Sequence, residues 1–185
     1  MKTLIKKLLR KNILQEAILN ENKNRYGCLM VNLEVDTWSS LTKIIDKEDL
    51  YEPEGDSDYG IEKQPHVTIL FGLHGSIKDK DIEIEIKKIK EPEIKIKDVS
   101  IFNQKEYEVL KFDVESSDLK KLNKKFCEFP HTTDFPDYHP HITIAYLKPK
   151  TSEKYIKKIK DLDFNFKIKN ICYSKANGDS KNYKI

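Results

Sequence analysis

A short pattern that can support acid–base chemistry occurs twice in this chain of 185 residues. It reads Pro-His-Val-Thr-Ile at residues 65–69 and Pro-His-Ile-Thr-Ile at residues 140–144. Side chains alternate between the two faces of a β-strand, so in each copy the histidine and the threonine share one face while aliphatic residues enter a core. Two such strands beside one site would offer two imidazoles and two hydroxyls, a set that suits a phosphodiester.

The two copies supply four candidate catalytic residues: His66 and Thr68, then His141 and Thr143. One imidazole would take the proton of a 2′-hydroxyl that attacks phosphorus, and the other would protonate the leaving 5′-oxygen. An unperturbed imidazole pKa of about 6.5 makes both protonation states accessible near neutral pH. The threonine hydroxyls would donate hydrogen bonds to the non-bridging oxygens. Either histidine can be the base in this scheme, which needs no metal and no other cofactor.

Two other arrangements of histidines are weighed against this interpretation. A third His-x-Thr match begins at His131, but an acidic residue, an aromatic residue and a proline follow it, so we expect a loop. His139 and His141 form a His-x-His pair with aspartates nearby, which is the alternative of a transition-metal site. Because Pro140 separates the pair and the repeat already assigns His141, we expect no metal there.

A nucleotide substrate would also need an aromatic surface for its bases. Tyr26, on the first expected strand, is the candidate, since stacking on a ring contributes about 1–3 kcal/mol per base and tolerates different bases. The alternative is that Tyr26 packs at the edge of the core. Phe71 and Tyr146 follow the motifs on the same strands, but strict alternation places both on the core side, so they are left out.

Composition restricts the class of protein. Charged residues make up 35% of the chain, yet the net charge is only +3, which favours a small anionic ligand over a nucleic-acid duplex. No apolar run approaches the roughly 20 residues that cross a bilayer, and no secretory signal is recognisable, so we expect a cytoplasmic protein. Cys28, Cys127 and Cys172 are widely spaced and include no Cys-x-x-Cys pair, which argues against a disulfide framework or a zinc site.

The chain divides into two parts. Residues 1–22 place apolar side chains at helical spacing between Lys and Arg, which predicts an amphipathic helix; it could lie on a membrane surface, but we expect it to pack on the domain. Residues 23–185 would form a single domain. Expected strands cover residues 26–35, 66–73, 93–102, 107–114, 141–147, 164–173 and 183–185. Expected helices cover residues 38–45, with Asp36 as N-cap, residues 117–126, and the surroundings of Ile156 and Ile159. Residues 82–89 fit a helix with Ile82, Ile86 and Ile89 on one face, but Ile82, Ile84 and Ile86 also alternate, so a strand is the alternative there.

The two motifs resemble those of the 2H phosphoesterase superfamily, in which a His-x-[Ser/Thr]-x-hydrophobic pattern occurs twice. The resemblance extends over residues 26–185 and implies an α+β, bilobal, pseudo-twofold fold. In that fold two antiparallel sheets face a central cleft with the helices outside. Members include RNA 2′,5′ ligases, cyclic phosphodiesterases and 2′,5′-oligoadenylate phosphodiesterases, so the resemblance defines the chemistry better than the substrate.

Three further segments resemble the phage anti-CBASS phosphodiesterases: Tyr-Gly-Cys-Leu-Met at 26–30, Tyr-Gly-Ile-Glu at 59–62 and Tyr-Ser-Lys at 173–175. Those enzymes degrade cyclic di- and trinucleotide messengers, such as cGAMP, of bacterial antiphage signalling. The resemblance implies cleavage of 3′-5′ linkages in such messengers, in the host cytoplasm, as a means of immune evasion. The family holds the base with an aromatic and an acidic residue near the C-terminus. This chain has no Trp beyond Trp38, so Tyr173 or Tyr183 would substitute, and we take Tyr173 as the second substrate-binding candidate.

Two other functions are kept as alternatives. One is an RNA-end enzyme, a 2′,3′-cyclic phosphodiesterase or a 2′,5′ RNA ligase-like enzyme, which the small net charge disfavours because gripping RNA calls for a basic groove. The other is a catalytically silent protein that sequesters a nucleotide, which would need no second imidazole. We expect the protein to act as a monomer on a cyclic oligonucleotide.

Overall fold

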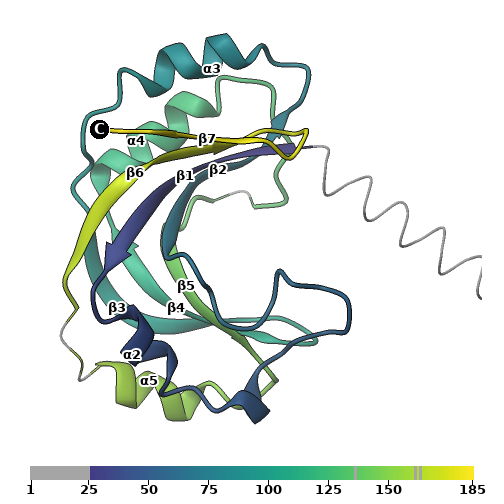
Figure 1. The fold of residues 1–185 in the computed structure, drawn as a ribbon, viewed down its shortest axis with the longest axis vertical. Helices are drawn as coiled ribbons and strands as arrows, with labels where there is room; N and C mark the ends of the chain where they lie inside the picture. Colours follow the sequence, from purple (N-terminus) through teal and green to yellow (C-terminus); the bar gives the residue numbers. More distant parts are fainter. Residues whose placement is uncertain (1–25, 136, 161, 163) are drawn as a thin grey trace, which may run out of the picture.

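The computed structural model describes residues 26–135, 137–160, 162 and 164–185. The amphipathic helix expected at residues 1–22 lies outside them. The described residues form an α+β fold, as expected, with seven strands, four α-helices and a short 3-10 helix (Figure 1). In chain order these are β1 (Tyr26–Val35), α2 (Trp38–Thr42), η1 (Lys47–Asp49), β2 (His66–His74), α3 (Asp79–Ile86), β3 (Lys95–Asn103), β4 (Glu108–Glu115), α4 (Ser117–Phe126), β5 (His141–Leu147), α5 (Glu153–Lys160), β6 (Phe166–Ser174) and β7 (Ser180–Tyr183).

All seven strands belong to one antiparallel sheet in the order β3-β4-β5-β2-β1-β6-β7. This differs from the two separate sheets that we expected. Each motif strand pairs extensively with its outer neighbour, β2 with β1 and β5 with β4, whereas β2 and β5 meet at the pair of Val67 and Ile142. Two groups of strands are thus joined edge to edge, and the two motif strands lie side by side at the junction.

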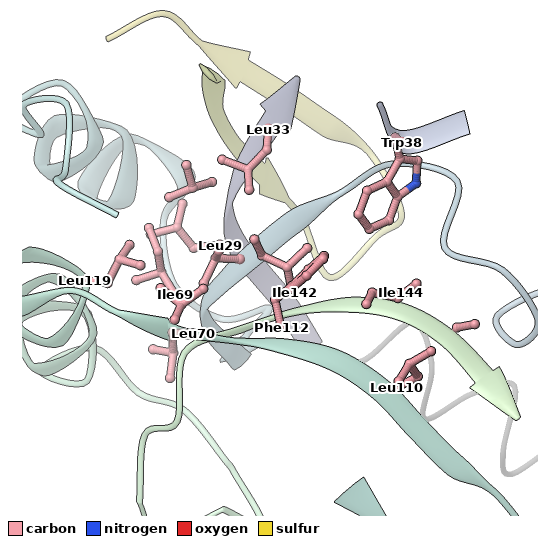
Figure 2. Close-up of a cluster of buried hydrophobic side chains, with 14 of the residues drawn as sticks. Leu29, Leu33, Trp38, Ile69, Leu70, Leu110, Phe112, Leu119, Ile142 and Ile144 are labelled. Carbon is pink, nitrogen blue, oxygen red and sulfur yellow. The ribbon is translucent and has the colours of Figure 1, made fainter. Parts of the chain in front are cut away.

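The core lies on one face of this sheet. Figure 1 shows a strongly curved sheet with the helices on the outer side of the curve. Buried residues of the sheet pack there against Trp38 and Leu41 of α2 and against the inner faces of α3, α4 and α5. Figure 2 shows the centre of the cluster, where Ile69 and Ile142 from the two motif strands lie near Phe112. The helices therefore leave the inner face of the sheet to the polar half of each motif.

Local sequence explains most element boundaries. Ser116 caps α4 by accepting a hydrogen bond from the backbone N–H of Leu119 at 3.1 Å, and the helix covers residues 117–126 as expected. The helix expected at residues 38–45 ends at Thr42, and its N-cap is Thr37 rather than Asp36. The last strand lies at β7, three residues before its expected start, because it pairs with β6 directly across the turn at Gly178. None of the helices in the described ranges is long and apolar enough to span a bilayer.

Candidate active site

The two His-x-Thr motifs lie next to each other on the inner face of the sheet. Val67 and Ile142 are paired and buried on the core side, so the residues flanking each of them project to the opposite face. Because the strands are antiparallel, this register sets His66 beside Thr143 and Thr68 beside His141. The structure thus brings together all four candidate catalytic residues.

Both imidazoles are held by the same contact. Nδ1 of His66 lies 2.9 Å from the carbonyl oxygen of Gln64, and Nδ1 of His141 lies 2.8 Å from the carbonyl oxygen of His139. A carbonyl only accepts hydrogen bonds, so each Nδ1 carries a hydrogen and donates it. In a neutral ring the lone pair is then on Nε2, which makes Nε2 the atom that exchanges a proton with a substrate.

The surroundings of the motifs are also repeated. The carbonyl oxygens of Pro65 and Pro140 each accept a hydrogen bond from the neighbouring outer strand, from the N–H of Leu33 at 2.9 Å and of Val114 at 3.1 Å. Each proline therefore anchors the start of a motif strand to its outer neighbour, one on β1 and the other on β4. The two halves of the site are built in the same way, in line with the duplication in the sequence.

The surroundings of His141 lower its pKa below that of a solvated imidazole. Burial is the largest effect and lowers the pKa of His141, and the positive charge of Lys111 and the neighbouring His66 lower it further. The hydrogen bond to the His139 carbonyl and the charge of Asp113 act in the opposite direction but do not cancel these effects. The neutral form of His141, which is the form that accepts a proton, is therefore favoured near neutral pH.

Lys111 and Asp113 are residues of the site that sequence reasoning missed. Lys111 is 3% exposed, lies opposite Thr143 on β4 and donates hydrogen bonds to Ser100 and to the carboxylate of Asp113. Asp113 lies opposite His141. The signal in the sequence was the spacing, since a Lys-x-Asp pair at period two on a strand presents both charges on one face, as His-x-Thr does.

The two motif threonines are partly or fully shielded from solvent in the same region. Thr143 is 9% exposed, and Thr68 is half-buried on its strand. The backbone carbonyl of Thr68 accepts a hydrogen bond from the Tyr138 hydroxyl at 2.8 Å. This bond fastens the segment that leads into β5 onto β2, so it fixes one motif relative to the other.

Phe71 lies on the motif face, contrary to the expectation from strict alternation. In the pairing of β1 with β2, Met30 is opposite Thr68 and Cys28 is opposite Phe71. Two steps along β1 correspond to three along β2, so β2 contains an additional residue and its alternation reverses. The Phe71 ring is 53% exposed as a result, and its centroid is 6.5 Å from that of Tyr26.

Tyr146 is displaced in the same way on the other motif strand. In the pairing of β4 with β5, Lys111 is opposite Thr143 and Val109 is opposite Tyr146, so β5 also gains a residue and its alternation reverses. The Tyr146 ring contacts Tyr59 of the acidic loop before β2, at 5.1 Å between ring centroids. That loop is therefore attached to the motif face by aromatic contacts.

The two expected base-binding tyrosines have different positions. Tyr26 begins β1 on the motif face, with its ring centroid 5.7 Å from that of His74. Tyr173 is opposite Leu29, on the core face, and is only 3% exposed. Its hydroxyl lies 3.3 Å from Asp79 of α3, so its ring packs between the sheet and that helix and offers no surface to a ligand at the motifs.

The remaining histidines lie around the site without entering the repeat. His131 belongs to a loop, as expected, and forms an isolated bridge with Leu73. The hydroxyl of Thr132 is 2.8 Å from Nε2 of His74, so the third His-x-Thr match binds the end of β2. Within the described residues, no group of three or more His, Cys, Asp or Glu side chains is arranged to hold a metal ion, His139 and His141 included.

Comparison with known protein families gives a match over both motifs. A family model described as anti-CBASS protein Acb1 matches residues 61–182, well over half of the chain. The matched span includes both motifs and the strands from β2 to β6, while β1 with Tyr26 precedes it. None of the curated proteins compared with the chain matches it. The match over both motif strands shows that the chain belongs to the anti-CBASS protein Acb1 family.

Proposed function

We propose that the protein is a phosphodiesterase of the 2H type that cleaves 3′-5′ linkages in cyclic di- or trinucleotide messengers. Membership of the anti-CBASS family places it among proteins that counter CBASS immunity, in which such messengers are the signal. The observation that carries the proposal is the antiparallel juxtaposition of the two motifs, which sets each imidazole beside the threonine of the other motif. A single phosphate group can contact all four side chains at such a site.

The reaction would proceed by transfer within the substrate. One neutral imidazole takes the proton of the 2′-hydroxyl, whose oxygen forms a bond to phosphorus as the bond to the 5′-oxygen breaks. The second imidazole, protonated, gives its proton to that 5′-oxygen. The hydroxyls of Thr68 and Thr143 donate hydrogen bonds to the non-bridging oxygens as charge develops on them. The product carries a 2′,3′-cyclic phosphate, which water can open with the same two imidazoles in reversed roles.

The inner face also has a surface for the bases. Tyr26 and Phe71 lie on the motif face, and their rings meet edge to face near the end of β2. A base could stack on either ring, and stacking does not select strongly among bases. The net charge of +3 agrees better with a small anionic ligand than with a long RNA. These features favour a cyclic oligonucleotide as the substrate.

The proposal is tested by incubating the protein in EDTA with 3′,3′-cyclic GMP-AMP, and separately with a short RNA ending in a 2′,3′-cyclic phosphate. We expect the cyclic dinucleotide to be opened. Cleavage of the RNA end alone would show the RNA-end enzyme instead, and cleavage of neither would overturn the assignment.

Variants then test the residues. His66→Ala and His141→Ala should each lower kcat by about 100- to 10,000-fold, because each imidazole moves a separate proton. His131→Ala is the matched control, since its Nδ1 also donates to a carbonyl two residues earlier, at 2.8 Å, although it lies outside the repeat. It should keep wild-type activity. Full activity in either motif variant would refute the site.

A further inference from the structure

The inner face of the sheet contains a buried cation beside the second motif. The ammonium group of Lys111 is 2.7 Å from the hydroxyl of Ser100 and hydrogen-bonded to the carboxylate of Asp113. It also lies over the ring of Phe102, 4.0 Å from the centroid. Lys111 is 3% exposed. A charged group is seldom buried to this extent without a role in the fold or the chemistry, because removing it from water is costly.

This cation is coupled to His141 through two neighbours. The ring of Phe102 meets the imidazole of His141 edge to face, with 5.0 Å between centroids and 87° between planes. Phe102 therefore contacts the ammonium group with its face and lies against His141. Asp113, the partner of Lys111, is directly opposite His141 in the pairing of β4 with β5. Two partners of Lys111, Phe102 on β3 and Asp113 on β4, thus lie next to His141.

Among the described residues, the position beside His66 that corresponds to Asp113 is uncharged. The residue opposite His66 on β1 is Asn32, the position that corresponds to Asp113 beside the second motif. Asn32 is uncharged, 3% exposed, and donates a hydrogen bond to Oδ1 of Asn170 at 3.0 Å. The two imidazoles therefore have the same backbone contacts but different charges beside them. Two titratable groups in unlike environments are how enzymes separate an acid from a base.

We propose that Lys111 is a positioning residue that fixes His141 as the proton acceptor of the reaction and leaves His66 as the proton donor. The inference rests on the proposed phosphodiesterase activity and deepens it. Lys111 would act through His141 and Phe102, since two of its three N–H donors bind Ser100 and Asp113 and its ammonium group lies over the Phe102 ring. Its charge repels a proton from His141, while the Phe102 ring holds the imidazole in place.

The charges around His141 come from three strands. On β4 Lys111 opposes protonation and Asp113 favours it, and on β2 His66 opposes it. On β3, Asp98 is paired with Asp113 in the sheet and forms an ion pair with Lys160 at 2.8 Å, which compensates its charge.

Further neighbours of His141 carry no charge. They include the hydroxyls of Thr68 and Thr143, the ring of Phe102 and the carbonyl of His139. Burial lowers the pKa of His141 most, and the charges of Lys111 and His66 lower it further.

The direct test is to titrate His141 by NMR in the full-length protein, with its signal assigned by His141→Gln. Lys111→Met should move the midpoint upward by about one pH unit, because the opposing charge is gone and Asp113 remains. Asp113→Asn should move it downward. Lys154→Met is the matched control, since it removes a lysine that is paired with Asp49 at 2.5 Å outside the motif face, and should leave the midpoint unchanged.

Opposite shifts in the two variants cannot result from general disruption of the fold. If Lys111→Met does not fold, Asp113→Asn alone decides, because a midpoint that stays in place or rises refutes the coupling. Lys111→Arg keeps the charge and should restore a midpoint close to that of the wild type. An unchanged midpoint in Lys111→Met would overturn the proposal.

The pH–rate profile identifies the role. A base must be neutral, so kcat rises with pH through the pKa of His141, and Lys111→Met should displace this acid limb to higher pH. Turnover at pH 5.5 should fall by about tenfold, with less than about a twofold change at pH 8. Displacement of the alkaline limb instead would make His141 the acid and refute the assignment. If the wild type cleaves no substrate, the proposed function fails, whereas the NMR titration still tests the coupling.

Discussion

Gly72 of β2 and Thr132 are in backbone contact. The N–H of Thr132 donates a hydrogen bond to the carbonyl oxygen of Gly72 at 2.9 Å, and Gly72 has a φ of +100°. A Cβ added to Gly72 would lie only 1.8 Å from the carbonyl oxygen of Thr132. The loop between α4 and β5 is therefore fastened to the motif strand next to Phe71, at a position where only glycine fits.

Gly72→Ala should destabilise the protein strongly, by more than about 3 kcal/mol, because it adds a backbone collision to the strain of a left-handed conformation. Gly178→Ala is the matched control: its φ is +91°, but no atom lies within 4 Å of the added Cβ. It should cost only about 1–2 kcal/mol. Urea unfolding of both variants measures the difference. Similar losses would show that the loop yields and that its contact with Gly72 is weak.

Ile142→Ala should cost about 2–5 kcal/mol of unfolding free energy, because Ile142 is 1% exposed and pairs with Val67 where the two strand groups join. Ile142→Val, which removes one methylene, should cost about 0.5–1.5 kcal/mol. Urea unfolding measures both losses, provided that the unfolding free energy depends on urea concentration with the same slope in each variant. If the alanine variant lost no more unfolding free energy than the valine variant, the junction would not be a packed part of the core.

Glu108 makes the stability of the protein depend on pH. It is 7% exposed and accepts hydrogen bonds from the hydroxyl of Ser152 at 2.5 Å and from the N–H of Lys150 at 2.7 Å. Burial is the largest single effect and raises its pKa, but the hydrogen bonds together outweigh it and lower the pKa. A lowered folded-state pKa contributes stability above the unfolded value of about 4.3, and this contribution is lost as pH falls through the folded-state value.

Glu108→Gln should therefore cost about 1–3 kcal/mol at pH 7, and less as the pH falls through the lowered pKa of Glu108, where the wild type itself becomes protonated. Glu115→Gln, at the exposed end of the same strand, should change stability by less than about 0.5 kcal/mol at either pH. Chemical unfolding at pH 7, 4.5 and 3 follows the difference. If the loss of unfolding free energy in Glu108→Gln stayed constant from pH 7 to pH 3, the charged form of Glu108 would not be what stabilises the fold.

The elements and motifs could be predicted from local patterns, because both depend on the residues within one strand or helix. The alternation of His66 and Thr68 with buried residues predicted the face of β2 correctly. The isoleucines at positions 82, 84 and 86 fitted both a helix and a strand, and the structure shows the helix α3 there. Alternation stops being informative after a bulge. Phe71 and Tyr146 were placed on the wrong face because the additional residue in each strand is fixed by pairing with a neighbour, which the strand's own sequence does not show.

Long-range packing was the other source of error. Tyr173 was chosen for the ring near the C-terminus, but the register of β6 against β1 turns it toward Asp79 in the core. The pairing of β2 with β5 likewise decided that one sheet forms in place of two. The spacing of Lys111 and Asp113 puts both charges on one face of β4, but that this face lies at the motifs follows only from the pairing of β4 with β5. Register between strands distant in sequence depends on the whole fold.

Phe71→Ala should raise KM for a cyclic dinucleotide by about 5- to 100-fold, with kcat changed by less than about twofold, because the exposed ring beside Thr68 would stack a base without taking part in proton transfer. Tyr26→Ala should act in the same direction. Ile84→Ala is the control, since Ile84 is 45% exposed on α3, on the helix side of the sheet. Steady-state kinetics with 3′,3′-cyclic GMP-AMP distinguishes them. A KM in Phe71→Ala equal to that of Ile84→Ala would remove Phe71 from the binding surface and leave Tyr26 as the base platform.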